Sequence, residues 1–140
     1  MNYVLDCSFT SALFLPDESS KQITSFFSRN NDKKNLIVPQ LWWLELSNVL
    51  YVSIKRKRLS YADAIKVYNL FTEFDIETDH LMNEKVANSI LEIANKNDIS
   101  AYDASYIELS IRKNANLATL DKKLANTAKQ CGILVLEIKH

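Results

Sequence analysis

The stretch SAYDASYIELSIRKNANLATLDKKLANTAKQCGILVLEI, residues 100–138, holds the pattern that decides the fold. Residues 101–113 and 122–131 have the amphipathic spacing of helices. Leu117–Leu120 and Ile133–Ile138 are short apolar runs typical of buried strands. Helices that alternate with such strands favour a parallel sheet, because consecutive parallel strands need a crossover connection.

The same alternation extends toward the N-terminus. Tyr3–Leu5 and Leu36–Val38 read as further buried strands and Phe74–Ile76 as a weaker one, and helical patterns lie at residues 20–30, 40–57, 61–73 and 80–96. We therefore predict an α/β fold with a central, mostly parallel sheet of about four or five strands and helices on both faces. The chain has no repeats and no linker rich in Pro, Gly or Ser, so residues 1–140 are expected to form one domain.

The composition of the chain excludes several classes of function. The chain has 17 basic and 17 acidic residues, so a polyanion would have to bind at a local patch. Its one glycine, Gly132, excludes a G-x-G-x-x-G dinucleotide loop and a P-loop. Cys7 and Cys131 follow no metal or redox spacing, which suits reduced cysteines of a cytoplasmic protein. The sequence has no secretory signal pattern and no apolar run long enough to span a membrane, so no membrane contact is expected.

Glu45 is the one charged residue between Lys34 and Lys55, within the apolar run VPQLWWLELSNVLYVSI. On a helix its side chain falls within the apolar arc, beside Val49. A buried carboxylate without a partner costs several kcal/mol. Glu45 therefore requires a basic partner, a proton, a water-filled cleft or a metal.

Three aspartates are expected near Glu45. Asp6 and Asp121 each follow a predicted strand directly, and Asp103 lies on the inward arc of the predicted helix 101–113. The carboxyl ends of parallel strands meet at one edge of the sheet, where ligand clefts form. Four acids at one cleft would repel unless a divalent cation joined them, and their oxygen ligands suit Mg²⁺ or Mn²⁺. Such a site suits phosphoryl transfer, in which the metal activates a water molecule.

Each acid also has a simpler interpretation. Asp6 and Asp121 could be helix N-caps, and Asp103 could form a capping box with Ser100, as Asp63 could with Ser60. Glu45 could form a buried salt bridge with a distant Lys or Arg. The four positions together favour a metal site.

Other features are weaker. Lys55, Arg56, Lys57 and Arg58 end the predicted helix 40–57, where cations favourably meet the helix dipole; they could also contact RNA phosphates. Trp42 and Trp43 are more typical of a core or an interface than of a base-stacking platform.

Four segments give the sequence a family resemblance: VLDCSFTSALFLPDE (4–18), PQLWWLELSNVL (39–50), KRLSYADA (57–64) and SAYDASYIELSIRKNANLATLDKKLANTA (100–128). Together they resemble the motifs of the PIN-domain family, and within it those of the VapC toxins of bacterial toxin–antitoxin systems. The last segment is the most specific. The fold implied is a three-layer PIN-like sandwich.

The resemblance makes Asp6, Glu45, Asp103 and Asp121 the acidic cluster that holds Mg²⁺ or Mn²⁺ and performs catalysis. Ser8 and Thr119 match hydroxyl residues that would contact the metal ligands or a metal-bound water. The sequence departs from the family at Asn114-Ala115-Asn116, where a glycine often follows the helix; Asn tolerates the same left-handed conformation.

The resemblance also implies a substrate and partners. It predicts a metal-dependent endoribonuclease toxin, a homodimer, that cleaves RNA with a metal-activated water and is silenced by a cognate VapB-like antitoxin. Two rivals stay open. A haloacid-dehalogenase-type phosphatase would use Asp6 as nucleophile, although Ser8 stands where its general acid is needed. A non-catalytic module would use the fold only to bind RNA or protein.

Overall fold

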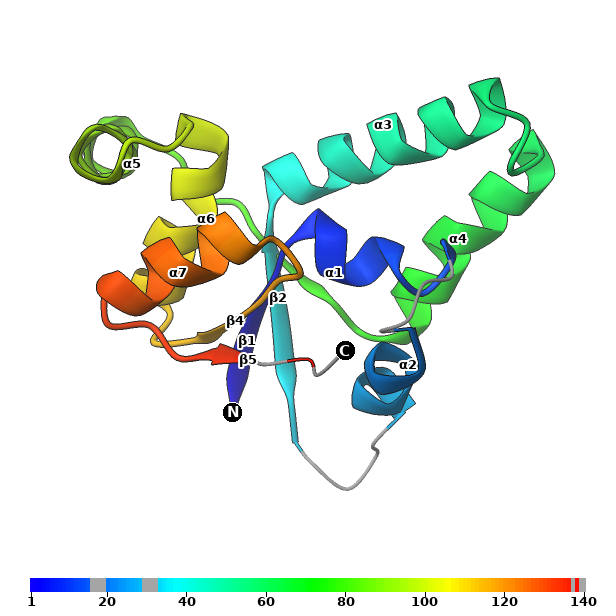
Figure 1. The fold of residues 1–140 in the computed structure, drawn as a ribbon, viewed down its shortest axis with the longest axis horizontal. Helices are drawn as coiled ribbons and strands as arrows, with labels where there is room; N and C mark the ends of the chain where they lie inside the picture. Colours follow the sequence, from blue (N-terminus) through cyan, green and yellow to red (C-terminus); the bar gives the residue numbers. More distant parts are fainter. Residues whose placement is uncertain (16–19, 29–32, 137, 139–140) are drawn as a thin grey trace.

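The computed structural model describes residues 1–15, 20–28, 33–136 and 138. In chain order its elements are β1 (Asn2–Leu5), α1 (Cys7–Ser11), α2 (Ser20–Ser28), β2 (Asn35–Pro39), α3 (Gln40–Lys55), α4 (Tyr61–Glu73), β3 (Glu77–Asp79), α5 (Glu84–Asn97), α6 (Ala101–Arg112), β4 (Asn116–Ala118), α7 (Lys122–Gln130) and β5 (Val135–Leu136) (Figure 1). The predicted α/β class is therefore confirmed.

The strands form one parallel sheet in the order β3-β2-β1-β4-β5. β1 lies at its centre, where Tyr3 is in register with Leu36 of β2 on one side and with Asn116 of β4 on the other. Val4, Leu5 and Val38 are fully buried, which explains why these strands read as apolar runs.

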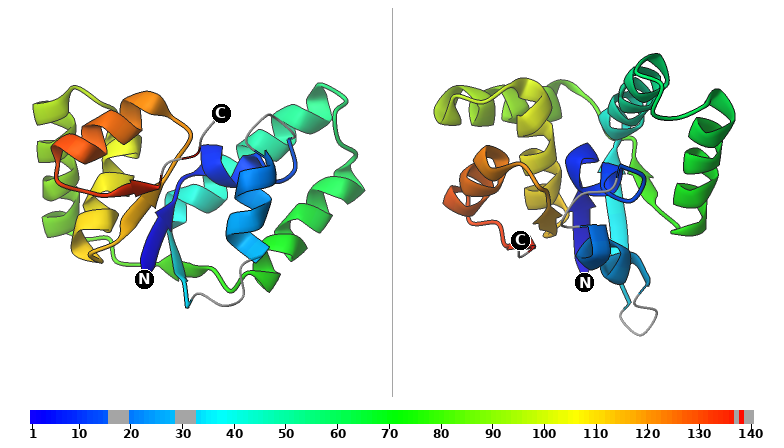
Figure 2. Two further views of the ribbon diagram at one scale, coloured as in Figure 1. Left: turned by 60° about the horizontal axis from the view of Figure 1, so that its bottom comes forward. Right: turned by 45° about the vertical axis from the view of Figure 1, so that its right-hand side comes forward.

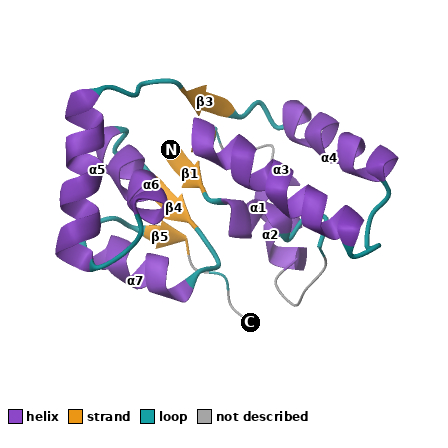
Figure 3. Cartoon of the chain, turned by 90° about the horizontal axis from the view of Figure 1, so that it is seen from above, coloured by secondary structure: helices purple, strands orange, loops and turns teal. Residues whose placement is uncertain are grey.

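The order of the strands reverses beside β1. The chain moves outward from β1 to β2 and β3, then returns to β4 on the other side of β1 and continues to β5. Figures 2 and 3 show the consequence: α1 to α4 gather on one side of the strands, and α5, α6 and α7 on the other. A reversal of this kind opens a crevice at the carboxyl ends of the two strands that flank it, here β1 and β4.

Large aromatic side chains fill the core between α3 and the sheet. Trp42 and Phe71 are fully buried with their rings 5.3 Å apart, and the Trp42 indole donates a hydrogen bond to Thr10 Oγ1 at 3.1 Å. Trp43 donates to Thr78 Oγ1 at 2.8 Å. Both tryptophans are therefore structural, as the sequence indicated, because their polar groups are satisfied inside the protein.

The sequence pattern misplaced the third strand. It comprises Glu77–Asp79, whereas the predicted strand Phe74–Ile76 covers the C-cap of α4 and the turn that follows. Phe74 and Ile76 are apolar because they pack against the core, and Asp75 turns the chain with φ of 53°. An edge strand of polar residues gives no hydrophobic signal.

Other boundaries differ by smaller amounts. Helix α5 begins at Glu84 rather than residue 80, because Asn83 caps it by accepting from the Val86 N–H. β5 is shorter than the predicted run 133–138, and the predicted helix end at residues 29–30 lies outside the described residues. Among the helices of the described residues, none is both long and apolar enough to cross a bilayer.

Candidate functional site

Asp6 lies at the carboxyl end of β1 and is 6% exposed. It is the N-cap of α1, because its Oδ1 accepts from the Phe9 N–H at 3.0 Å. Burial raises the pKa of Asp6 to about 6; hydrogen bonds from Thr119, Phe9 and Ser8 oppose this shift, and the charge of Asp121 adds to it. The cap interpretation is correct for Asp6, and the capping carboxylate still lies at the carboxyl end of β1, where the crevice is expected.

Two hydroxyl groups connect Asp6 to the end of β4. Ser8 Oγ donates to Asp6 Oδ1 at 2.7 Å and accepts from the Leu120 N–H at 3.1 Å. Thr119 Oγ1 donates to Asp6 Oδ2 and accepts from the Asp121 N–H at 3.0 Å. The first and the last of the candidate acids are thus held together across the strand reversal by Ser8 and Thr119.

Asp121 is the N-cap of α7, with its Oδ1 accepting from the Leu124 N–H at 3.0 Å. It is exposed, and it lines a hollow of about 270 Å³ next to Thr119 and Leu120. Its negative charge raises the pKa values of both Asp6 and Asp103. The cap interpretation is again correct, and Asp121 still acts electrostatically on two other acids.

Glu45 and Asp103 line one cleft of about 780 Å³, together with Ser8. Asp103 comes from the first turn of α6, where Ser100 caps the helix by accepting from the Asp103 N–H at 3.1 Å. Burial raises the pKa of Asp103, the charge of Asp121 adds to this shift, and Lys123 opposes it. The first turn of α6 and the second turn of α3 therefore place two carboxylates in the same space.

Tyr106 fixes the Glu45 side chain. Its hydroxyl donates to Glu45 Oε1 at 2.5 Å, and its own side chain is 2% exposed. Burial and the Glu45 carboxylate raise the pKa of Tyr106 far above its usual value, so the group stays a phenol and donates a hydrogen bond. Tyr106 was not among the predicted site residues, although its position three residues after Asp103 places both on one face of α6.

The salt-bridge interpretation of Glu45 finds no support. Within the described residues, no Lys, Arg or His nitrogen lies within ion-pair distance of its carboxylate. Its partners are a phenol and the open cleft. Glu45 is thus a half-buried carboxylate that faces a cavity.

The donor atoms of this region suit a hard cation. Asp6, Glu45, Asp103 and Asp121 supply carboxylate oxygens, and the one thiol at the cleft, Cys7, has its pKa raised to about 11 by burial. Burial is the main cause of the raised pKa values of Asp6 and Asp103, and a divalent cation would offset the charge of Asp121 that adds to it. Among the residues described, however, no three acidic, His or Cys side chains lie close enough to share one ion. Joint binding would require side chains to turn toward one another.

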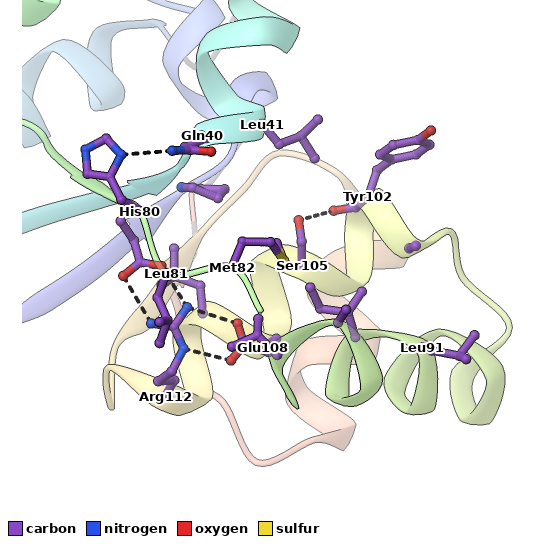
Figure 4. Close-up of a pocket in the computed structure, with 17 residues that line it drawn as sticks. Gln40, Leu41, His80, Leu81, Met82, Leu91, Tyr102, Ser105, Glu108 and Arg112 are labelled. Atoms are coloured by element: carbon purple, nitrogen blue, oxygen red, sulfur yellow. Dashed lines mark hydrogen bonds and ion pairs between the residues drawn. The ribbon is translucent and has the colours of Figure 1, made fainter. Parts of the chain in front are cut away.

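A second cavity lies beside the cleft and shares Leu41 and Tyr102 with it. This apolar groove of about 430 Å³ lies between α5, α6 and the segment Asp79–Met82 (Figure 4). Its acids are already neutralised: Arg112 pairs with Asp79 and with Glu108, each at 2.8 Å. The groove therefore offers no candidate acid for a metal.

Comparison with known proteins identifies the family. The PIN domain profile matches residues 3–130, which include all four candidate acids. This chain belongs to the PIN domain family. Ribonuclease VapC3 of Pyrobaculum aerophilum is 28% identical to it over 125 residues, covering 89% of this chain and 93% of that protein. Ribonuclease VapC9 of Mycobacterium tuberculosis is 29% identical over 134 residues, covering 95% and 97%.

A solved structure has the same fold. VapBC-1 of nontypeable Haemophilus influenzae contains a chain that superposes on this PIN domain with a TM-score of 0.70, covering 98% of each chain at 20% identity. At this identity the similarity establishes the fold alone. The predicted PIN-like fold is confirmed, and the haloacid-dehalogenase alternative gains no support.

Proposed function

We propose that this PIN domain is a VapC-type toxin, a metal-dependent endoribonuclease that hydrolyses RNA phosphodiester bonds. The observation that carries the proposal is the cleft, where Glu45 from α3 and Asp103 from α6 face one cavity. The chain that forms this cleft belongs to the PIN domain family. The names of its relatives, which are VapC ribonucleases, support the choice of RNA.

Each candidate acid is assigned a role. Asp6, Glu45, Asp103 and Asp121 would hold Mg²⁺ or Mn²⁺, and Ser8 and Thr119 would keep Asp6 ionised and oriented. The bound ion would lower the pKa of a water molecule and offset charge on the phosphate under attack. Tyr106 would keep Glu45 directed toward Asp103 while the substrate enters.

The expected partners follow from the relatives. We expect a VapB-like antitoxin, since a structural relative carries the name VapBC-1, and we expect a homodimer in the cytoplasm. An antitoxin that placed a basic side chain among the acids would replace the charge of the metal. Of the basic residues Lys55 to Arg58, which were predicted as possible contacts for RNA phosphates, we keep Arg56 and Arg58 as candidates, because they line a hollow next to the cleft and Lys55 and Lys57 do not.

The test is cleavage of a mixed pool of structured RNAs by the purified protein, in Mg²⁺ or Mn²⁺ against EDTA. Glu45→Gln and Asp103→Asn should each abolish cleavage while the protein stays folded. Asp63→Asn is the matched control, because Asp63 occupies the same place after Ser60 in α4 that Asp103 occupies after Ser100 in α6. Asp63→Asn should therefore keep full activity.

A binding measurement separates metal affinity from catalysis. Mn²⁺ titration followed by electron paramagnetic resonance should show weaker binding for Asp103→Asn than for Asp63→Asn. Cleavage that survives EDTA, or equal Mn²⁺ affinity in both variants, would contradict the proposed site.

A non-catalytic binding module is the alternative, and the spacing of the acids favours it, because no three of the described acids share metal-binding distance. In that case, Asp103→Asn would leave RNA binding unchanged. The wild type would not cleave RNA, whichever metal ion is added.

A further inference from the structure

One stripe of α3 runs from the cleft to the basic end of the helix. At about 100° per residue, Arg56 lies within about 20° of Glu45 around the helix axis, whereas Lys55 lies about 80° away. Val49 and Val52 fall between them, within about 40° of Glu45 around the axis. Glu45 and Arg56, the C-cap residue of α3, therefore lie on the same side of the helix axis.

The surface along this stripe is hollowed throughout its length. The cleft that contains Glu45 and Asp103 is lined further along by Leu15, Asn48 and Val49. The same three residues line a second hollow of about 250 Å³, whose far end is formed by Arg56 and Arg58. The two hollows thus form one groove, and Lys55 and Lys57 are not part of its lining.

The basic end of this groove is held in place. The Arg58 N–H donates to the Ser53 carbonyl at 2.8 Å, and the Lys57 N–H donates to the Ile54 carbonyl at 2.9 Å. Arg56 and Arg58 are exposed, and neither forms an ion pair with an acid of the described chain. Figure 1 shows α3 running from the top of the sheet out to this turn before α4. Two exposed guanidinium groups on a turn whose backbone is hydrogen-bonded suit an anion of repeating charge.

We propose that an unpaired RNA strand lies along this groove, with the phosphate to be cleaved at the acids and a phosphate several nucleotides away at Arg56 and Arg58. The proposal rests on the proposed ribonuclease function. The eleven residues from Glu45 to Arg56 extend about 16 Å along the helix. At about 3.4 Å per stacked nucleotide this length spans about five nucleotides, and fewer if the strand is extended.

The charges of the groove explain why such a contact is needed. The acidic end repels RNA until a cation neutralises it, so attraction must come from outside the cleft. Arg56 and Arg58 supply it without entering the cleft. A groove that follows one helix face fits a single strand, whose backbone can follow a line of positive charge.

The experiment compares two double variants that each remove two charges from the same turn. Arg56→Gln with Arg58→Gln changes the groove, and Lys55→Gln with Lys57→Gln is the matched control. Fluorescence anisotropy would follow binding of a labelled single-stranded RNA of about 12 nucleotides, in EDTA, between about 50 and 200 mM salt. Circular dichroism would verify that both variants fold.

Two lost phosphate contacts should make the slope of log K against log salt shallower by about 1.4 in the arginine variant. Over that salt range the wild type should then lose about sevenfold more affinity than the arginine variant does. The lysine variant should keep the wild-type slope. Equal changes in both variants, or no change in either, would overturn the proposal.

Two further probes identify the kind of polyanion that the groove binds. The same RNA annealed to its complement should show no difference between the two variants, and an equal effect on duplex would overturn the assignment to an unpaired strand. If the arginine variant lost binding to poly-glutamate but kept its binding to RNA, the assignment to RNA would be overturned in favour of an acidic protein segment. Because binding is measured in EDTA, absent cleavage would contradict the proposed function and leave this result standing.

Discussion

The Tyr106 hydroxyl donates a hydrogen bond of 2.5 Å to Glu45 Oε1 and thereby joins α6 to α3. Tyr106 and Asp103 lie three residues apart on α6, so the helix that carries one acid also positions the other. Residues that orient a metal ligand affect affinity without contacting the metal.

Tyr106→Phe removes this hydrogen bond and keeps the ring. We expect Mn²⁺ affinity to fall by roughly tenfold or more, because a hydrogen bond to a charged group contributes about 1.5–3 kcal/mol. Tyr68→Phe is the control: it also removes a tyrosine hydroxyl that bonds to α3, at Ser47 Oγ, outside the cleft. Equal Mn²⁺ affinity of the two variants would show that Tyr106 does not position Glu45.

Asp103→Asn should stabilise the protein when no metal is present. Burial and the charge of Asp121 raise the pKa of Asp103, which means that its ionised form is unfavourable in the folded state. Asp63→Asn should instead destabilise slightly, since it removes a favourable charge from the first turn of α4. Urea unfolding in EDTA measures both changes, and a loss of stability in Asp103→Asn would contradict the expected repulsion.

Asp6 should make stability depend on pH in the opposite direction to most acids. Its pKa rises from 3.8 unfolded to about 6 folded, so its protonated form stabilises the fold below pH 4, and this contribution is lost as pH rises through 6. Asp6→Asn keeps a good N-cap and removes the charge. In EDTA at pH 7.5 the variant should be more stable than the wild type by up to about 3 kcal/mol. The gap should close near pH 4, and a constant gap would refute the assignment.

Arg112→Gln should destabilise the protein by about 3 kcal/mol at neutral pH, because Asp79 and Glu108 would remain as largely buried charges. Arg112 holds the pKa of Asp79 below its usual range, so the pair stabilises the fold above pH 4 and this stability is lost as pH falls further. Thermal unfolding at pH 7 and pH 3 tests both statements. Arg58→Gln, at an exposed site, should change stability by less than about 0.5 kcal/mol.

The sequence predicted most of the fold because the central strands are buried on both faces. Val4, Ile37 and Leu117 give continuous apolar runs of strand length. Glu77–Asp79 gives none, because it is a polar strand at the edge of the sheet. Helix α1, with five residues, is too short to show a helical period.

The sequence predicted which acids belong to the candidate site, but it did not predict the distances between their side chains. Asp6 and Asp121 were found because each directly follows a predicted strand, although the observed strand β4 ends earlier, at Ala118. How their side chains turn depends on contacts between residues more than 100 positions apart, such as that from Thr119 to Asp6. Periodicity within one segment cannot predict such contacts, and for the same reason it missed Tyr106, whose role depends on Glu45 in another helix.

The central position of β1 determines when this protein can complete its fold during synthesis. Asn2–Leu5 is synthesised before the other four strands, yet one side of this strand stays unpaired until Asn116–Ala118 has been made. A contact between such distant residues forms slowly, because a long loop must close first. Asp121 lies three residues after the end of that strand, so Ser8 and Thr119 can connect Asp6 to this end of β4 only after nearly all of the sheet has been made.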